Sequence, residues 1–193
     1  MTVPILLRGF AAAVVFAVLA SAGQGAERIC FEAEAGTPTD PVRVEEEGKA
    51  SGGKCVSIPE GAGKPPEVKG DLSFLIDVKK EGRYLLWARC WWDDGCGNSF
   101  KLAVDDAEPV VVGEDGTYKR WHWVNLRGVT FQLAAGEHGI KLLNNEDGIK
   151  VDQILLLTDR LYVPVAVEKV NCVPKRAEKS PEGSDPKESV PPG

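Results

Sequence analysis

The chain has 193 residues, a formal net charge of −6 and two histidines. This acidic balance argues against nucleic acid as a partner, because binding to phosphates needs clustered lysine and arginine. The two histidines have no ligand spacing, so structural zinc is unsupported, and no G-x-S-x-G, H-E-x-x-H or phosphate-binding glycine loop points to an enzyme.

Residues 1–22 have the pattern of a secretory signal peptide. Arg8 is the only charged residue, residues 10–19 form a short apolar run, and Ala20-Ser21-Ala22 offers a small-residue cleavage site. The run is too short for a membrane span, which takes roughly 20 apolar residues, and no other segment is a candidate. We therefore expect a secreted, periplasmic or cell-surface protein. Cleavage after Ala26 and a retained N-terminal anchor are the alternatives.

Residues 29–34, with the sequence ICFEAE, form the first predicted strand, and Glu32 and Glu34 fall on one face of it. Two carboxylates so close together repel each other unless a cation or a base lies between them. Calcium prefers hard oxygen ligands and would suit this position. The alternative is a pair of solvated glutamates on an edge strand.

The most distinctive segment is the predicted strand GRYLLWARCWW at residues 82–92, which follows shorter strands at 54–58 and 71–78. One face of it carries Tyr84, Leu86, Ala88, Cys90 and Trp92, and the other carries Arg83, Leu85, Trp87, Arg89 and Trp91. The first face suits a core. The second mixes tryptophan with arginine, which suits a half-exposed surface beside a polar loop; a strand buried on both faces is the alternative.

Cysteine occupies five positions: Cys30, Cys55, Cys90, Cys96 and Cys172. Export would permit disulfide bonds. The best local pair is Cys90 with Cys96, because these residues flank the loop that follows the tryptophan-rich strand. An odd count leaves one thiol free or paired between chains.

Further short strands are predicted at residues 99–104, 109–112, 121–126, 129–133, 140–143 and 150–157. No segment of residues 27–170 sustains a helical period, so the pattern predicts an all-β sandwich, for which a jelly roll is the commonest arrangement. We expect this domain to span residues 27–160. Residues 161–193 form a C-terminal extension, and its Pro-, Lys- and Glu-rich composition predicts disorder from about residue 174.

Seven short motifs follow one another in a recognisable order. They are E-A-E, Ser-Gly-Gly, G-x-Y-x-L-x-x-R, V-D-D, W-x-W, A-G-x-H-x-I and D-x-I, at residues 32–34, 51–53, 82–89, 104–106, 121–123, 135–140 and 152–154. In this order they resemble the carbohydrate-binding modules of families 6 and 35. The resemblance covers roughly residues 27–158 and implies a galactose-binding-like β-sandwich.

The resemblance also implies a structural calcium ion. In that family the ion is held by the carboxylates of the E-A-E strand, by the aspartate of the closing strand and by loop carbonyls. These carboxylates correspond here to Glu32, Glu34 and Asp152.

A sugar cleft among the loops at one end of the sandwich is implied as well. Its first aromatic corresponds to Trp91 or Trp92, and its second to Trp121 or Trp123. Lys150 stands where the family has an asparagine, and this change favours a carboxylated or sulfated sugar.

A sugar site needs an aromatic ring for the apolar face of the pyranose and polar groups for its hydroxyls. The polar residues expected near the rings are Asn98, Asn145, Glu146 and Lys150, with Asp93 and Asp94. The sequence thus predicts a secreted, non-catalytic, calcium-stabilised domain that binds a polysaccharide or glycan. The alternative is a structural or protein-interaction sandwich whose tryptophans are core or contact residues.

Overall fold

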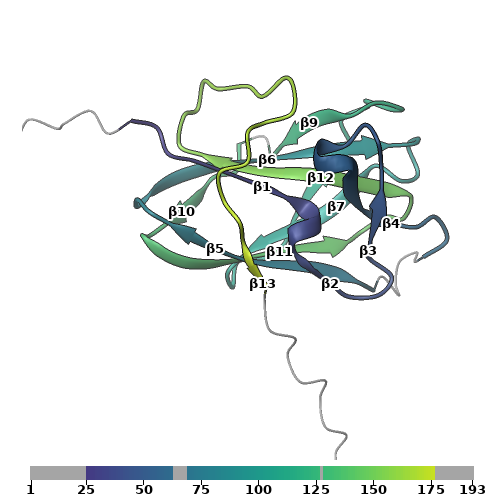
Figure 1. Cartoon of the computed structure of the whole chain (residues 1–193), viewed down its shortest axis with the longest axis horizontal. Coiled ribbons are helices and arrows are strands. Elements are labelled where there is room, and N and C mark those ends of the chain that lie inside the picture. Colours follow the sequence, from purple (N-terminus) through teal and green to yellow (C-terminus); the bar gives the residue numbers. More distant parts are fainter. Residues whose placement is uncertain (1–24, 63–68, 127, 177–193) are drawn as a thin grey trace, which may run out of the picture.

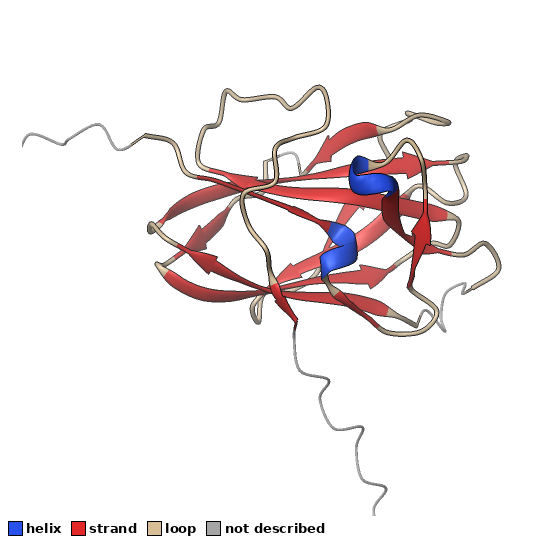
Figure 2. Ribbon diagram, in the orientation of Figure 1, coloured by secondary structure: helices blue, strands red, loops and turns tan. Residues whose placement is uncertain are grey.

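Two antiparallel β-sheets pack face to face in the structure, a computed structural model that describes residues 25–62, 69–126 and 128–176 (Figures 1 and 2). The expected all-β sandwich is therefore confirmed. Within these ranges, no helix is long and apolar enough to cross a membrane. The expected signal peptide, residues 1–22, lies outside the described residues.

The first sheet is built around the long neighbouring strands β6 and β12. β4 and β1 pair with the two halves of β12, β3 extends the sheet beyond β4, and β9 and β10 pair with the two halves of β6. Its strands are β1 (Arg28–Glu32), β3 (Arg43–Glu46), β4 (Lys54–Ile58), β6 (Gly82–Trp92), β9 (His122–Asn125), β10 (Phe131–Leu133) and β12 (Ile149–Leu157).

The second sheet has β11 at its centre, between β5 and β7. β8 extends it beyond β7, and β2 and β13 pair with the far side of β5. Its strands are β2 (Thr37–Pro38), β5 (Asp71–Val78), β7 (Ser99–Val104), β8 (Val110–Gly113), β11 (Gly136–Asn144) and β13 (Lys175–Arg176).

Alternation along the strands fills the core between the sheets. In β6 the side chains of the predicted core face, from Tyr84 to Trp92, are almost fully buried. In β5 every second side chain from Leu72 to Val78 is buried in the same core from the opposite sheet. This period of two places Arg89 and Trp91 on the outer face of the first sheet.

The segment after β12 continues over that outer face. We call residues 161–174 the strap (Figure 1). It covers a small second cluster formed by Cys30, Leu155 and Leu157 with the rings of Trp87 and Trp123. Past the edge of β1, the chain joins the second sheet as β13. This strand lies beyond residue 174, where the sequence predicted disorder to begin; residues 177–193 lie outside the described residues.

Two expectations from the sequence are corrected. β1 ends at Glu32, and residues Ala33–Ala35 form the 3₁₀ turn η1, so Glu34 does not lie on the strand. The predicted Cys90–Cys96 disulfide is wrong, since both thiols are free. Cys90 points into the core from β6, whereas Cys96 lies in an exposed loop, so the two side chains cannot meet.

Candidate functional site

Three carboxylates meet where η1 approaches β12. One ligand oxygen from each of Glu32, Glu34 and Asp152 lies within 4.8 Å of the others. Glu32 ends β1, Glu34 comes from the turn after it, and Asp152 sits at a register shift between Val151 and Gln153 in β12. A bulge of this kind re-aims a side chain. We call these three residues the carboxylate cluster.

Burial makes the cluster electrostatically costly. Asp152 is fully buried, and burial raises its pKa to about 6 even though the Arg89 guanidinium opposes the shift. Burial and repulsion from Glu32 and Asp152 raise the pKa of Glu34 to about 7. Each of these acids therefore resists ionisation unless positive charge is supplied.

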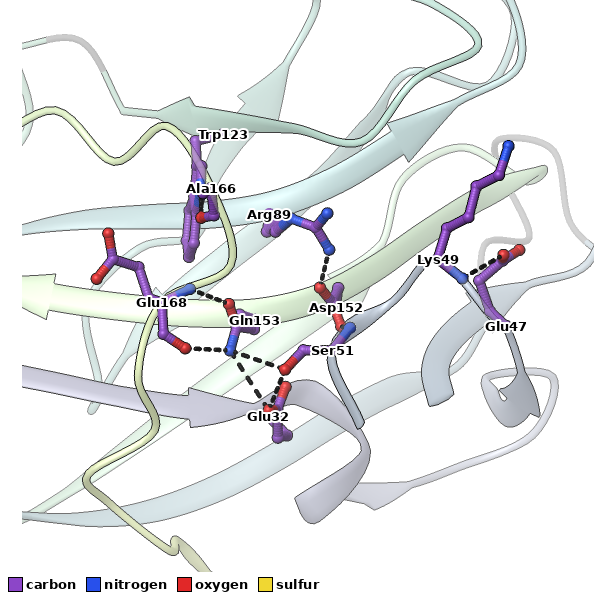
Figure 3. A network of polar contacts seen from close by, with 10 residues as sticks. All are labelled: Glu32, Glu47, Lys49, Ser51, Arg89, Trp123, Asp152, Gln153, Ala166 and Glu168. Carbon is purple, nitrogen blue, oxygen red and sulfur yellow. Dashed lines mark hydrogen bonds and ion pairs between the residues drawn. The ribbon is translucent and has the colours of Figure 1, made fainter. Parts of the chain in front are cut away.

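Some oxygens of the cluster have partners and others have none. Arg89 forms an ion pair with Asp152, whose other oxygen accepts the Ser51 backbone N–H at 2.9 Å (Figure 3). The Ser51 hydroxyl donates to Glu32 Oε1 at 2.6 Å. The buried atoms Glu32 Oε2 and Glu34 Oε2 have no hydrogen-bond partner among the described residues. These unpaired hard oxygens fit a calcium ion.

An aromatic surface lies next to the cluster, on the outer face of the first sheet. The rings of Trp91 and Trp121 are tilted against each other with centroids 6.4 Å apart, and Arg89 Cζ lies 5.1 Å from the centroid of the Trp121 ring. All three side chains are partly exposed. We call Arg89, Trp91 and Trp121 the platform.

A pocket of about 500 Å³ adjoins the platform and shares Trp91 with it. Strands β3, β4 and β12 form its floor, and the loops after β4, β6 and β11 form its rim. Its charged lining residues are Arg43, Glu45, Glu60, Asp93, Asp94, Asp147 and Lys150. The pocket thus lies at the loop end of the sandwich, where the sequence analysis expected a cleft.

Lys150 lies in this pocket but is already paired. Its Nζ lies 3.1 Å from both Glu45 Oε1 and Glu47 Oε2. Burial by itself would lower the pKa of Lys150, but hydrogen bonds and charges from the two glutamates outweigh that effect and raise it. This pairing removes the reason for expecting Lys150 to select an anionic sugar.

The other two candidate tryptophans, Trp92 and Trp123, do not offer an open ring face to a ligand. Trp92 is fully buried and packs against Phe100 and His122, so the expectation that it contacts a ligand is dropped. Trp123 lies under the strap, and its indole N–H donates to the Ala166 carbonyl at 2.8 Å (Figure 3).

The remaining polar candidates fasten loops together. Glu146 accepts hydrogen bonds from the Asn98 backbone N–H at 3.0 Å and from the Ser99 hydroxyl at 2.7 Å. Asn145 donates to the same hydroxyl at 2.8 Å, and the Asn98 side chain is buried and donates to Tyr118. These residues shape the rim of the pocket without lining it.

Sequence reasoning assigned no role to Arg89, Glu45 or Glu47. Arg89 was visible as the last residue of the G-x-Y-x-L-x-x-R motif, but its partners come from β12 and from the segment before β9. Glu45 and Glu47 lie in and beside β3, within a stretch that reads as a loop because it is rich in proline and glycine.

No protein-family model matches the sequence, and no curated protein matches it. Solved structures do share its fold. A family 35 carbohydrate-binding module from Clostridium thermocellum superposes with a TM-score of 0.51 at 15% identity, over 67% of this chain and 97% of that chain.

Two enzymes contain a similar part. The GH26-CBM35 β-(1,4)-mannanase from Podospora anserina has a TM-score of 0.56 at 19% identity, over 71% of this chain and 29% of its own. The exo-β-1,3-galactanase from Phanerochaete chrysosporium, solved with galactose, has a TM-score of 0.51 at 18% identity, over 67% and 29%. The chain thus spans less than a third of each enzyme. The chain shares the fold of the family 35 carbohydrate-binding module.

Proposed function

We propose that this chain is an exported, non-catalytic carbohydrate-binding module whose ligand stacks on the platform and extends into the adjoining pocket. The observation that carries the proposal is the partly exposed Trp91, which belongs to both surfaces. The CH groups of a pyranose pack on an aromatic face. Hydroxyls left without a partner on burial cost about 1–3 kcal/mol each, so polar groups of the pocket would select the sugar.

The charges of the pocket favour a neutral glycan over a carboxylated or sulfated one. Its two basic residues, Arg43 and Lys150, already form ion pairs with glutamates. Asp93, Asp94 and Asp147 add negative charge to the rim. An anionic sugar would therefore meet repulsion without an unpaired cation among the described lining residues.

Calcium is proposed as the structural ion of the carboxylate cluster. Glu32, Glu34 and Asp152 would hold it, and the two unpaired buried oxygens support this assignment. When bound, the ion would neutralise the buried carboxylates and tie η1 to β12.

Glycan binding by the purified full chain tests the proposal. Binding to an array of neutral polysaccharides is expected. Trp91→Ala and Trp121→Ala should each weaken it at least about fivefold, if a sugar stacks on a ring about as strongly as a nucleobase does, at about 1–3 kcal/mol. Trp92→Phe is the matched control, since its side chain lies in the core.

Equal binding by the wild type and both alanine variants would reject the platform as the ligand site. Release of reducing sugars from any plain polysaccharide by the purified chain would instead contradict the non-catalytic assignment.

A further inference from the structure

Arg89 touches both halves of the candidate site. Its guanidinium pairs with Asp152 of the carboxylate cluster on one side and lies 5.1 Å from the Trp121 ring on the other (Figure 3 shows the first contact). The Arg89 side chain is only 11% exposed, and Asp152 is fully buried. Little water therefore separates these charges.

We propose that Arg89 is a positioning residue that couples cation binding at the carboxylate cluster to the arrangement of the platform. This inference rests on the proposed function, since it assumes a cation at the cluster and a glycan at the platform. Three carboxylates face a single arginine, so the cluster keeps an excess of negative charge even with that ion pair formed.

A divalent cation beside Asp152 would repel the guanidinium that shares this carboxylate. Charges only a few ångströms apart interact strongly where water is scarce. The neighbour that can accept the displaced guanidinium is the face of Trp121, because an aromatic face attracts a cation. Cation binding thus moves the Arg89 guanidinium away from Asp152 and closer to the Trp121 ring, which packs against Trp91.

The coupling must work in both directions. If the cation strengthens glycan binding by some factor, the glycan strengthens cation binding by the same factor. Arg89 also competes with the cation for Asp152, so removal of the guanidinium should raise the affinity for calcium. A residue with a purely structural role would not do this.

Calcium alone is sufficient as the probe. Calorimetric titration of the wild-type chain with calcium chloride should be accompanied by a change in tryptophan fluorescence, and Trp121→Phe should abolish that change. Arg89→Met should bind calcium at least about fivefold more tightly, the lower end of typical couplings, and should show no fluorescence change. Arg83→Met, on the same strand but exposed, should match the wild type in both measurements.

Calcium binding without a fluorescence change in the wild type, or unaltered calcium affinity in Arg89→Met, would overturn the coupling while leaving glycan binding intact. The absence of any calcium binding would overturn both the coupling and the structural ion, and the glycan array would still report on the platform. If Arg89→Met fails to fold, Arg89→Lys replaces it. That variant keeps the charge but not the planar group, and should show a reduced fluorescence response.

Discussion

Trp91 and Trp92 are adjacent in the sequence, but their side chains lie on opposite faces of β6. Trp92→Ala should therefore lower the free energy of unfolding by about 3–5 kcal/mol, as expected for a large buried aromatic. Trp91→Ala should lower it by less than about 1 kcal/mol. Urea unfolding followed by circular dichroism measures both.

Trp92→Phe should be much milder than Trp92→Ala. The buried indole N–H of Trp92 has no hydrogen-bond partner among the described residues, so phenylalanine removes a polar group that is already unsatisfied. An equal loss of stability in the two variants would contradict this account of Trp92.

His138 makes stability depend on pH. Its two ring nitrogens face Asp105 Oδ2 at 2.7 Å and the Ala134 carbonyl at 3.0 Å. Burial by itself would lower the pKa of His138, but these hydrogen bonds outweigh that effect and raise it. A raised folded pKa means that the protonated ring adds stability below its unfolded value of about 6.5, and that this contribution disappears as pH rises through the folded value.

The predicted effect of His138 is therefore a loss of stability on going from pH 5.5 to pH 8.5. It should amount to less than about 1 kcal/mol, because the partner Asp105 is 45% exposed and water screens the pair. His138→Gln should lack this component, and the difference between the two urea-unfolding series isolates it. Parallel pH profiles for the two chains would show that His138 does not contribute.

At the level of the elements, two loops on the rim of the pocket approach each other closely at Gly97. A Cβ atom at Gly97 would lie 2.2 Å from the Asp147 carbonyl oxygen, whereas at Gly95 the nearest atom is 3.4 Å away. Gly97→Ala should push the two loops apart, cost about 1–3 kcal/mol and weaken glycan binding. Gly95→Ala is the control and should be close to the wild type in thermal unfolding and in binding.

Hydrogen bonds from the Asn171 side chain attach the strap to the backbone of β1. The side chain of Asn171 accepts the Cys30 N–H and donates to the Arg28 carbonyl, both at 2.8 Å. Asn171→Ala leaves these two groups without partners and should cost about 1–3 kcal/mol in urea unfolding. Lys169→Ala, at an exposed position of the same segment, should change stability by less than about 0.5 kcal/mol. A similar loss in both variants would mean that Asn171 is not an anchor.

For the whole molecule, calcium should raise the thermal unfolding midpoint. A ligand that binds only the native state at about 100 times its Kd adds about 2.7 kcal/mol, which corresponds to roughly 5–10 °C for a domain of this size. Glu34→Gln should reduce the shift, and Glu46→Gln, whose side chain is exposed, should leave it unchanged. Identical midpoints in calcium and in EDTA would remove the structural ion from the proposal.

The period-two alternation of the strands was enough to predict most of the fold. The sequence predicted β4, β5 and β7 with their observed bounds and identified the core face of β6, because alternating burial is a local signal. It missed β2 and β3, which are short strands in a stretch rich in proline and glycine.

Prediction of the site was less complete because its contacts are distant in sequence. The carboxylate cluster was visible as a motif, and the structure brings its three residues together. The pairing of Lys150 with Glu45 and Glu47 spans about a hundred residues, and the cover over Trp123 comes from the strap. Neither of these contacts produces a periodic pattern in the sequence, so neither could be predicted from it.

The strap also determines which contacts break first when the chain is pulled beyond residue 176. The last described strand, β13, pairs with β5 over only two residues. The strap before it is hydrogen-bonded to the first sheet at Asn171 and Glu168. A load applied beyond residue 176 therefore acts first on β13 and then on these bonds, one after another. The strap would peel away bond by bond and lengthen the molecule before the load passed along the chain into β12. The bonds broken on the way end on Cys30 of β1 and Gln153 of β12.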